Sequence, residues 1–508
     1  MTKEFLQDLI SFAQQKGFVW GPEPEIYGGS AGFYTYAPLG KLLKNNVENA
    51  IRKVFSDEDF FEVECPIVMP KKVWEASGHL GGFSDPIVKD KKGNVFRADN
   101  LIEEKLGKES VVINGKTIIF DGASEEDLLA VIKKFNIKSP TGEDLIPEIK
   151  KHNLMMKTTV GLDGESYNRP ETATTTYLPF IRYVDFFRSK FPFGVFQIGK
   201  AFRNEISPRQ HVLRQREFTQ AEGQLFLFKE QKNNFPKFEE VKNLKLPLRY
   251  YDKKKKEYVS FNFNKGAELS LDKAIKDKKL KNKAYAWTLA LAHNLFINVG
   301  IPKEKIRLTQ HEPEKMAFYA EDAWDIEINL KSFGWFEVCG VHDRADYDLT
   351  QHSKFSNQKL QARMDDTSEP EVPHVLEIAF GSDRPTFALL DIYYEKLADG
   401  VGKTTFKIPA KMAPIKIAVL PLMRKPELIA VARSIYDNLK VAYKTKYDET
   451  ASIGKRYLRA SEEGIPYCIT IDYESLDDKC VTVRERDSEK QERVKISELK
   501  DYLFKVLN

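Results

Sequence analysis

The chain has 508 residues, of which 42% are hydrophobic and 30% charged, and its formal net charge is +4. This length exceeds what one hydrophobic core usually serves, so we expect about two to four domains. The near-neutral charge excludes a global field that attracts nucleic acid, and leaves any such contact to local basic patches.

The N-terminal segment, MTKEFLQDLISFAQQ, contains Glu4 and Asp8 and lacks a basic region followed by an apolar core, so it is not a secretory signal. Its apolar residues recur at helical spacing and predict an amphipathic helix. The most apolar window, residues 284–299, is interrupted by Thr288 and His293 and predicts a core helix, not a membrane span. The 4 cysteines include no pair at C-x-x-C spacing, which indicates a reducing compartment and argues against a zinc knuckle. We therefore expect a cytoplasmic protein without membrane contact.

Residues 18–40 are rich in glycine, proline and aromatic side chains and contain the strings EIYGG and GFYTYAPLG. A helix is predicted from Lys41 to about Phe55, and an apolar strand follows near residues 60–66. Taken alone, this stretch is most typical of a Gly/Pro-rich loop that caps an ordinary helix.

The next segment, residues 71–160, is polar, rich in lysine and glutamate, and interrupted by short strand patterns. Within it, SEEDLLAVIKKF predicts a helix capped by Ser124. We interpret residues 81–160 as an insertion into a larger domain. The string RPETATTTYLPF, residues 169–180, follows the insertion.

The most informative stretch is residues 196–226, FQIGKAFRNEISPRQHVLRQREFTQAEGQLF, which predicts two apolar strands joined by a basic loop. Because side chains i and i+2 share a strand face, one face of the first strand would carry Arg203 and Glu205. By the same rule, one face of the second strand would carry Arg214, Arg216, Phe218, Gln220 and Glu222. Surface ion pairs contribute little to stability, so this gathering suits a planar polyanion beside an ammonium group, such as ATP with an amino acid. The alternative is a solvated, charge-rich hairpin.

Further on, residues 229–310 are predicted to form a second insertion, whose lysine run 253–256 is either a solvated turn or a contact for nucleic-acid phosphates. Residues 322–353 begin as a strand pattern and end in the polar string VHDRADYDL. Residues 373–391 predict a strand, a glycine turn and a helix, with Arg384 at the junction. After a linker near residue 410, strands and helices alternate as in α/β folds.

Three of these segments resemble the motifs of class II aminoacyl-tRNA synthetases. FRNE, followed by an arginine and REF, resembles motif 2, and residues 373–391 resemble motif 3. The helix, strand and proline after residue 40 resemble motif 1, which forms the dimer interface in that family. The fuller strings RNEISPR, EIYGG, RPETA and VHDRADYDL are similar to those of dimeric glycyl-tRNA synthetases. The resemblance covers nearly the whole chain and matches least in the two insertions.

This resemblance implies an α+β catalytic domain with a mixed, mainly antiparallel sheet at residues 1–410, and an α/β anticodon-binding domain at 411–508. It implies a homodimer that attaches glycine to tRNA(Gly) through a glycyl adenylate, using ATP and Mg²⁺. Many family members carry two C-x-x-C pairs in the first insertion, whereas this chain has DKKGN and SPTG there. No zinc is therefore expected.

Matching residue to residue, the resemblance assigns the ATP site. Arg203 would hold the α-phosphate and the glycine carboxylate, while Arg214 and Arg384 would hold the outer phosphates or flank the adenine. Phe218 would stack on the adenine, and Glu337 is the expected Mg²⁺ ligand. The expected catalytic residues are Arg203, Glu205 and Arg384. The full ATP-binding set is Arg203, Asn204, Glu205, Leu213, Arg214, Phe218, Glu337, Val338, Gly381 and Arg384.

Glycine has no side chain to grip, so its pocket must exclude a methyl group and hold the ammonium from several directions. The family positions for that task match Glu171, Glu222 and Glu377, and Arg97 and Arg344 match positions that line or brace the pocket. The family commonly has a serine where this chain has Ala379. The full glycine-binding set is Arg97, Glu171, Phe218, Glu222, Arg344, Glu377 and Gly381.

Two other functions remain open at this point. A catalytically inactive, synthetase-like nucleic-acid-binding subunit would keep the fold but lose phosphate-holding arginines, which are all present here. A class II ligase for another small amino acid, such as serine, proline or threonine, remains possible because of Ala379. In the last domain, Lys455, Arg456 and Arg459 on one predicted helix indicate either a tRNA contact or a solvated basic face.

Overall fold

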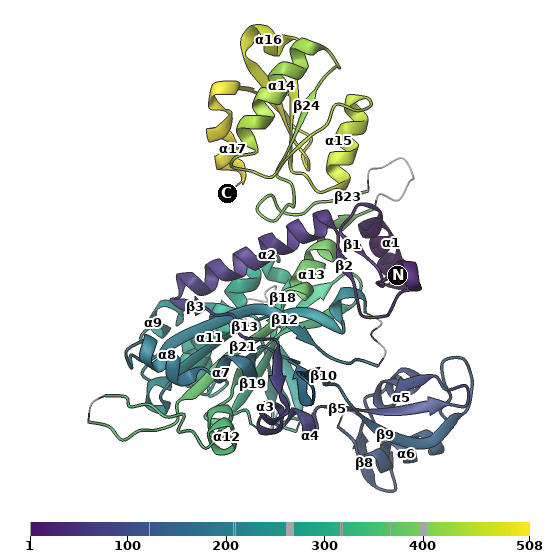
Figure 1. The fold of residues 1–508 in the computed structure, drawn as a ribbon, viewed down its shortest axis with the longest axis vertical. Coiled ribbons are helices and arrows are strands. Elements are labelled where there is room, and N and C mark those ends of the chain that lie inside the picture. Colours follow the sequence, from purple (N-terminus) through teal and green to yellow (C-terminus); the bar gives the residue numbers. More distant parts are fainter. Residues whose placement is uncertain are drawn as a thin grey trace.

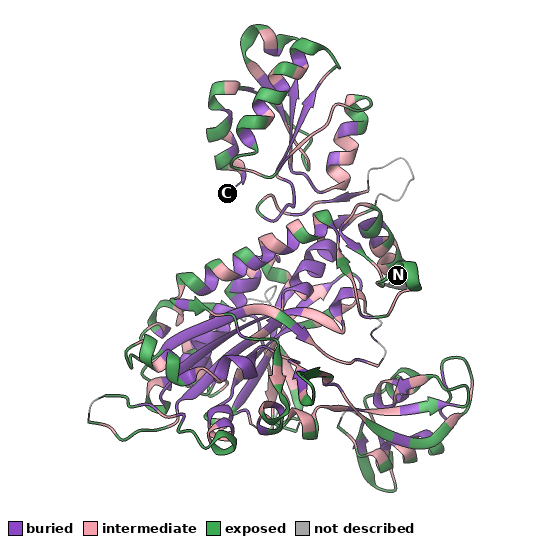
Figure 2. Ribbon diagram, viewed as in Figure 1, coloured by how far each residue is buried: buried purple, intermediate pink, exposed green. Residues whose placement is uncertain are grey.

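A computed structural model describes residues 2–120, 122–206, 208, 210–260, 269–314, 316, 319–365, 367–396 and 404–507. Figure 1 shows a large central α+β body, a small body beside it that contains β5, β8, β9, α5 and α6, and a C-terminal α/β body above helix α2. The strands at the centre of the large body are mostly buried, whereas the small body is largely exposed (Figure 2).

The large body is organised around one nine-stranded sheet in the order β16-β15-β18-β19-β20-β21-β13-β12-β3. Neighbouring strands run antiparallel except for the pairs β15–β18 and β12–β3, which are parallel. The sheet is thus mixed and mainly antiparallel, as expected. The strands are β16 (Glu257–Ser260), β15 (Leu248–Asp252), β18 (Ile306–Gln310), β19 (Asp322–Leu330), β20 (Gly334–Asp343), β21 (His374–Gly381), β13 (Glu217–Leu227), β12 (Phe193–Phe202) and β3 (Phe60–Glu62).

Helices α2 (Pro38–Asp57), α11 (Lys283–Asn298) and α13 (Asp383–Tyr393) pack together against the sheet. Asn282 caps α11 by accepting a hydrogen bond from the Tyr285 amide at 2.8 Å. This helix is buried nearly all round, which confirms the predicted core helix. Among the described residues, no helix is both long and apolar enough to cross a membrane.

Helix α2 contacts three regions of the molecule. Leu39 and Leu42 pack against the C-terminal body, and the Asn46 side chain donates to the Met412 and Ala413 carbonyls, both at 3.0 Å. A buried ion pair joins Lys44 to Asp383, the first residue of α13. Near the end of the helix, the Arg52 guanidinium pairs with Glu62 of the edge strand β3 at 2.9 Å.

The remaining elements of the large body surround this core. Helices α7 (Ala173–Tyr177), α8 (Phe180–Phe186) and α12 (Tyr347–Ser356) carry the residues that follow RPE and VHDR. The others are α1 (Thr2–Gln15), β1 (Val19–Trp20), β2 (Thr35–Tyr36), β4 (Val68–Pro70), α3 (Lys71–Ala76), α4 (His79–Gly82), β10 (Met156–Val160), β11 (Gly164–Asn168), α9 (Phe238–Val241), β14 (Lys245–Leu246), β17 (Leu269–Ser270), α10 (Leu271–Lys276), β22 (Tyr394–Glu395) and β23 (Thr405–Phe406).

The segment 229–310, expected as an insertion, is built into the core. It supplies three strands at one edge of the main sheet, together with the central helix α11. Part of this segment, 261–268, lies outside the described residues.

The small body has a core of its own, formed by side chains such as Val88, Leu101, Leu128 and Ile149. Ser124 caps α6 as predicted, since its side chain accepts from the Asp127 amide at 3.1 Å. Its elements are β5 (Ser84–Asp90), β6 (Val95–Arg97), α5 (Ala98–Leu106), β7 (Ser110–Ile113), β8 (Lys116–Ile119), α6 (Glu125–Lys134) and β9 (Leu145–Asn153).

The C-terminal body is a five-stranded sheet in the order β25-β24-β26-β27-β28, with three parallel strands followed by two antiparallel ones. Helices pack on it around an apolar core that includes Ile417, Leu428 and Ile469. The elements are β24 (Ile417–Pro421), α14 (Pro426–Leu439), β25 (Thr445–Tyr447), α15 (Ile453–Glu462), β26 (Tyr467–Ile471), α16 (Glu474–Asp478), β27 (Cys480–Glu485), β28 (Gln491–Lys495) and α17 (Leu499–Leu507).

Candidate active site

The candidate site lies on one face of the central strands, where their register places small residues between acidic ones. Glu222 of β13 is opposite Ala379 of β21, Ala379 is opposite Gly340 of β20, and Gly340 is opposite Asp325 of β19. Side chains in one such row point to the same face. The small side chains of Ala379 and Gly340 therefore leave a space between the carboxylates of Glu222 and Asp325.

That space is a cavity of about 300 Å³. Most of the residues predicted from the sequence meet there, although they come from distant segments of the chain. Those that line it are Glu171, Arg203, Glu205, Leu213, Arg214, Phe218, Glu222, Glu337, Arg344, Glu377, Gly381 and Arg384.

Besides the buried Arg344, three partly exposed arginines line this cavity and are restrained to different degrees. The Arg203 guanidinium lies between two rings, 5.5 Å from the Phe218 centroid and 5.2 Å from that of Phe83. Arg214 forms an ion pair with Glu205 at 2.7 Å, and Arg384 pairs with Glu337 at 3.3 Å. Each guanidinium is thus held at the cavity wall while remaining partly exposed, as an anion-binding group requires.

The acidic end of the cavity is a cup formed by Glu171, Glu222 and Glu377. Each carboxylate receives a hydrogen bond from a hydroxyl of one short segment around α7. Thr174 donates to Glu171 at 2.6 Å, Tyr177 donates to Glu377 at 2.9 Å, and the Thr172 hydroxyl donates to Glu222. Two of the threonines and the tyrosine that follow RPE thereby become part of the site.

The three carboxyl groups of the cup differ in charge. Burial, together with nearby Glu377 and Glu171, raises the pKa of Glu222 to about 8. Burial also opposes ionisation of Glu171, but His79 and Arg344 hold the pKa of its carboxyl below the usual value. For Glu377, the Arg344 charge and a hydrogen bond from His342 outweigh burial and lower the pKa. Near neutral pH the cup therefore holds two carboxylates and one mostly protonated acid.

Arg344 braces this arrangement from behind. Its guanidinium is buried and donates to both oxygens of Asp348, at 2.6 and 2.8 Å. It also donates to Glu377 at 3.1 Å. A planar donor shared between two carboxylates fixes the position of Glu377.

The comparisons with known proteins agree with this geometry. Residues 416–505 match the protein family described as anticodon binding domain. The chain is 38% identical to the glycine–tRNA ligase of Pyrococcus abyssi, over 99% of this chain and 98% of that protein. The chain belongs to the glycine–tRNA ligase family. A second family member, from Methanocaldococcus jannaschii, is 37% identical over 99% of both chains.

Two solved structures share the fold of this family member. The prolyl-tRNA synthetase of Giardia lamblia superimposes with a TM-score of 0.61 at 13% identity, over 100% of this chain and 80% of that one. The prolyl-tRNA synthetase of Cryptosporidium parvum gives a TM-score of 0.59 at 14% identity, over 100% and 78% of the two chains. The class II fold and the glycyl-type resemblance predicted from the sequence are confirmed.

Three residues of the expected set lie away from the cavity of this ligase. Arg97 lies in the small body, paired with Asp85 at 3.2 Å and Asp99 at 2.8 Å, so it does not reach the carboxylate cup. Instead it lines a separate hollow of about 60 Å³ that also touches Glu205 and Arg214. The other two are Val338, whose side chain is in the hydrophobic core, and Asn204, whose amide donates to the Leu154 carbonyl at 2.8 Å.

Two further expectations are wrong. Arg216 does not share the cavity face, because it precedes β13 and its guanidinium donates to the backbone carbonyls of Glu205 and Ala31 at 2.8 and 2.9 Å. On α15, Arg456 is only 3% exposed and donates to the Pro421 and Leu422 carbonyls. It therefore stabilises the C-terminal body and is not part of a free basic face.

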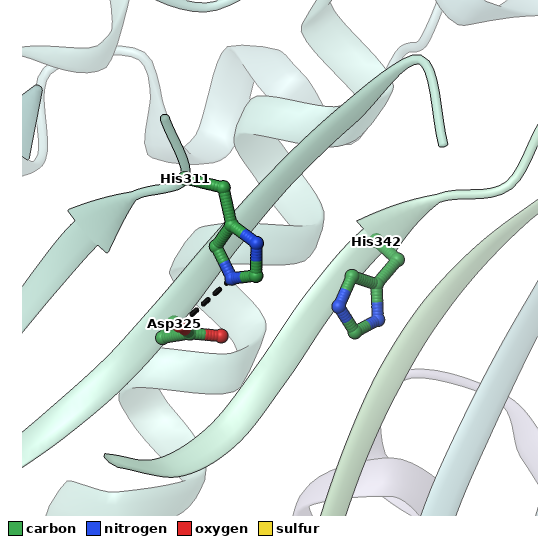
Figure 3. Close-up of side chains that lie close together, drawn as sticks. All are labelled: His311, Asp325 and His342. Carbon is green, nitrogen blue, oxygen red and sulfur yellow. Dashed lines mark hydrogen bonds and ion pairs between the residues drawn. The ribbon is translucent and has the colours of Figure 1, made fainter. Parts of the chain in front are cut away.

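Sequence reasoning missed three residues that line the same cavity, His311, Asp325 and His342. Figure 3 shows their side chains close together, with Asp325 and His342 on neighbouring strands and His311 directly after β18. The His311 Nε2 atom lies 2.7 Å from a carboxylate oxygen of Asp325. The sequence offered no distinct signal for them, because β19 alternates polar and apolar residues along DAWDIEINL and the two histidines come from distant segments.

Proposed function

We propose that this chain attaches glycine to tRNA(Gly) in two steps, with glycyl adenylate formed and consumed in the 300 Å³ cavity. The observation that carries the proposal is the meeting of three partly exposed arginines, Arg203, Arg214 and Arg384, with the acidic cup beside a floor of Ala379 and Gly340. Arginines suit the phosphates and the carboxylate of the substrates, and the acidic cup suits the glycine ammonium.

In the first step, a glycine carboxylate oxygen attacks the α-phosphorus of ATP, the bond to the β-phosphate breaks, and pyrophosphate leaves. Such reactions are accelerated by positioning and by neutralising charge on phosphate oxygens. Arg203, next to both Phe218 and the cup, would hold the α-phosphate and the glycine carboxylate. Arg214 and Arg384 would hold the outer phosphates, exchanging their pairing with Glu205 and Glu337 for phosphate contacts.

The charge of the site fits Mg²⁺ delivered with ATP. Glu337 has a side chain that is 57% exposed at the cavity wall, and a hard cation prefers a few carboxylates with phosphate oxygens. Glu337 would hold the ion, which neutralises phosphate charge. In the second step, a hydroxyl of the terminal adenosine of tRNA attacks the glycyl carbonyl and AMP leaves.

Glycine would be selected because the cup has no room for a side chain. The ammonium would lie among Glu171, Glu222 and Glu377, which places the α-carbon of the amino acid close to the backbone of the sheet. A larger side chain on that carbon would overlap the cavity walls. Ala379 lacks the family's serine hydroxyl at this point. Tyr177 supplies a hydroxyl to Glu377, so the cup keeps a donor for that carboxylate.

We also propose a homodimer formed through the β3 edge of the sheet. This edge strand carries Phe61, which is 49% exposed and packs edge-on against Phe186, itself 65% exposed. Exposed apolar side chains beside an unpaired strand favour burial against a second copy. Sedimentation of the chain is expected to give twice the monomer mass, and a Phe186→Asp variant to sediment as a monomer.

The C-terminal body, which matches the anticodon-binding family at residues 416–505, would bind the anticodon end of the tRNA. Since charged tRNA is used where mRNA is translated, we place the enzyme in the cytoplasm. An inactive binding subunit does not need the complete set of cavity arginines and carboxylates, and is disfavoured for that reason.

The test is amino-acid-dependent exchange of pyrophosphate into ATP, measured with each of the 20 standard amino acids. Exchange with glycine alone is expected. Exchange with alanine or serine but not glycine would refute the specificity, and none at all would favour the binding subunit. Arg203→Ala should abolish exchange and leave the far-ultraviolet circular dichroism unchanged, whereas the exposed Arg433→Ala in the C-terminal body should keep normal exchange.

A further inference from the structure

The cluster of His311, Asp325 and His342 has the composition and spacing of a metal site (Figure 3). One ligand atom from each residue lies within 4.8 Å of the other two. The three residues come from adjacent parts of one sheet. Asp325 is in β19, His342 is near the end of β20, and His311 directly follows β18, with its amide donating to Ala323 of β19 at 2.9 Å.

The backbone around the cluster is shaped to admit the His342 ring. A Cβ atom at Gly340 would lie 2.5 Å from Cε1 and 3.0 Å from Nε2 of that ring. Such distances are essentially excluded, so only glycine at this position allows the imidazole to lie there. Because Gly340 is opposite Asp325 in the register, the Nε2 edge of His342 is placed beside Asp325.

The other nitrogen of the same ring is already engaged in the manner of a metal-bound histidine. His342 Nδ1 lies 3.2 Å from a carboxylate oxygen of Glu377, whose charge is compensated by Arg344. A carboxylate can only accept a hydrogen bond, so Nδ1 carries a proton, and in the neutral imidazole this leaves Nε2 with its lone pair. Histidine ligands of metals typically donate their second N–H to a carboxylate in this way.

We propose that His311, Asp325 and His342 bind one divalent transition-metal ion of the zinc class on the wall of the cavity. Two imidazoles and one carboxylate suit Zn²⁺ or Co²⁺, whereas Mg²⁺ prefers oxygen ligands. Three protein ligands leave one coordination position open, and it faces the cavity. The side chains are 18 to 24% exposed, which leaves the ion a way in.

This site is distinct from the cysteine-based zinc sites that the sequence lacks, since it uses no sulfur ligand. It is also distinct from Glu337, the expected contact for Mg²⁺. To bind metal through Nε2, His311 must exchange its hydrogen bond to Asp325 for coordination, with the proton moved to Nδ1 or released.

A second cluster of similar composition provides a matched control. Ligand atoms of Glu321, Asp343 and His374 also lie within 4.8 Å of one another. There the buried Lys232 ammonium contacts Asp343 at 2.7 Å and Glu321 at 3.0 Å, so a cation already occupies the centre. The His374→Asn variant should therefore leave metal binding unchanged.

The experiment uses the full chain, stripped with a chelator and titrated with Co²⁺ while the visible absorption of the protein-bound ion is followed. One Co²⁺ per chain is expected, displaced by Zn²⁺ but not by excess Mg²⁺. His342→Asn and Gly340→Ala should each weaken binding at least tenfold, a typical effect of losing a ligand or its support. Gly340→Ala keeps all three ligands and removes only the space for the ring. Circular dichroism and thermal unfolding identify any variant that fails to fold, and His311→Asn then takes its place.

Each other outcome overturns the proposal. The site is absent if the unaltered chain binds no Co²⁺. Equal binding by the unaltered chain and by His342→Asn places the ion elsewhere, and loss of binding in His374→Asn assigns it to the second cluster. Displacement of Co²⁺ by Mg²⁺ would identify an oxygen-ligand site at Glu337.

Discussion

Glycine binding should expel a proton from Glu222. Burial and the neighbouring carboxylates raise the pKa of this residue to about 8, so about one molecule in ten has Glu222 ionised at pH 7 and about half at pH 8. An ammonium in the cup stabilises the ionised form. The apparent affinity for glycine should therefore rise about ninefold from pH 6 to 7 and about fivefold from pH 7 to 8.

The assay is the glycine KM in pyrophosphate exchange across this pH range, together with titration calorimetry in two buffers of different ionisation enthalpy. At pH 7, about 0.9 proton should be released for each glycine bound. Glu222→Gln should abolish both the proton release and the pH slope. The matched variant Glu217→Gln, on the same strand but paired with Lys200 outside the cavity, should keep them. A glycine KM that is flat from pH 6 to 8, without proton release, would refute the reasoning.

The same pKa has an opposite consequence for stability. Folded Glu222 holds its proton up to about pH 8, whereas the unfolded residue loses it near its ordinary pKa of 4.5. Between these values the folded state binds more protons, so this residue's contribution to the free energy of unfolding falls as the pH rises. In Glu222→Gln, that decline should be absent from urea unfolding measured at a series of pH values.

Three substitutions test buried contacts in the large body and in the C-terminal body. Gly40→Ala should lower the free energy of unfolding by about 1 to 3 kcal/mol, because a Cβ there would lie 1.8 Å from the Phe18 carbonyl oxygen; urea unfolding measures this. Lys44→Met should cost about 3 to 5 kcal/mol by the same measurement, since it leaves the buried carboxylate of Asp383 without its cation. Arg456→Ala should lower the melting temperature of the C-terminal body and leave pyrophosphate exchange unchanged, because two carbonyls lose their donor.

The controls for these substitutions lie nearby. Gly81→Ala meets no atom within 4 Å and should leave stability unchanged. For the buried pair, adding Asp383→Asn to Lys44→Met should recover part of the loss; no recovery would mean that the uncompensated charge is not the cause. Lys455→Ala, which is exposed on the same helix as Arg456, should not change the melting temperature.

The sequence was sufficient to predict site residues where their positions follow from a local pattern. The alternation of side chains along the hairpin, together with the motif around RNE, predicted that Arg203, Phe218 and Glu222 line one cavity. The same alternation failed for Arg216, because the strand begins only at Glu217 and the preceding loop turns its guanidinium toward backbone carbonyls. The sequence around Arg97 led to its assignment to the glycine pocket. The position of the small body, however, determines which residues its side chain contacts.

What the sequence could not provide was the pairing between distant strands. The row from Glu222 through Ala379 and Gly340 to Asp325 depends on the register of four strands. That register is set by packing across the whole sheet, and no local pattern reports it. The histidine cluster and the hydroxyls that contact the carboxylate cup were missed for this reason.

Helix α2 connects the C-terminal body to the cavity of the large body. Within less than one turn it holds the linker to the C-terminal body through Asn46, and Asp383 at the base of the cavity through Lys44. A packed helix moves as a stiff rod. A movement of the C-terminal body would therefore be transmitted through this helix to Asp383 at the cavity wall.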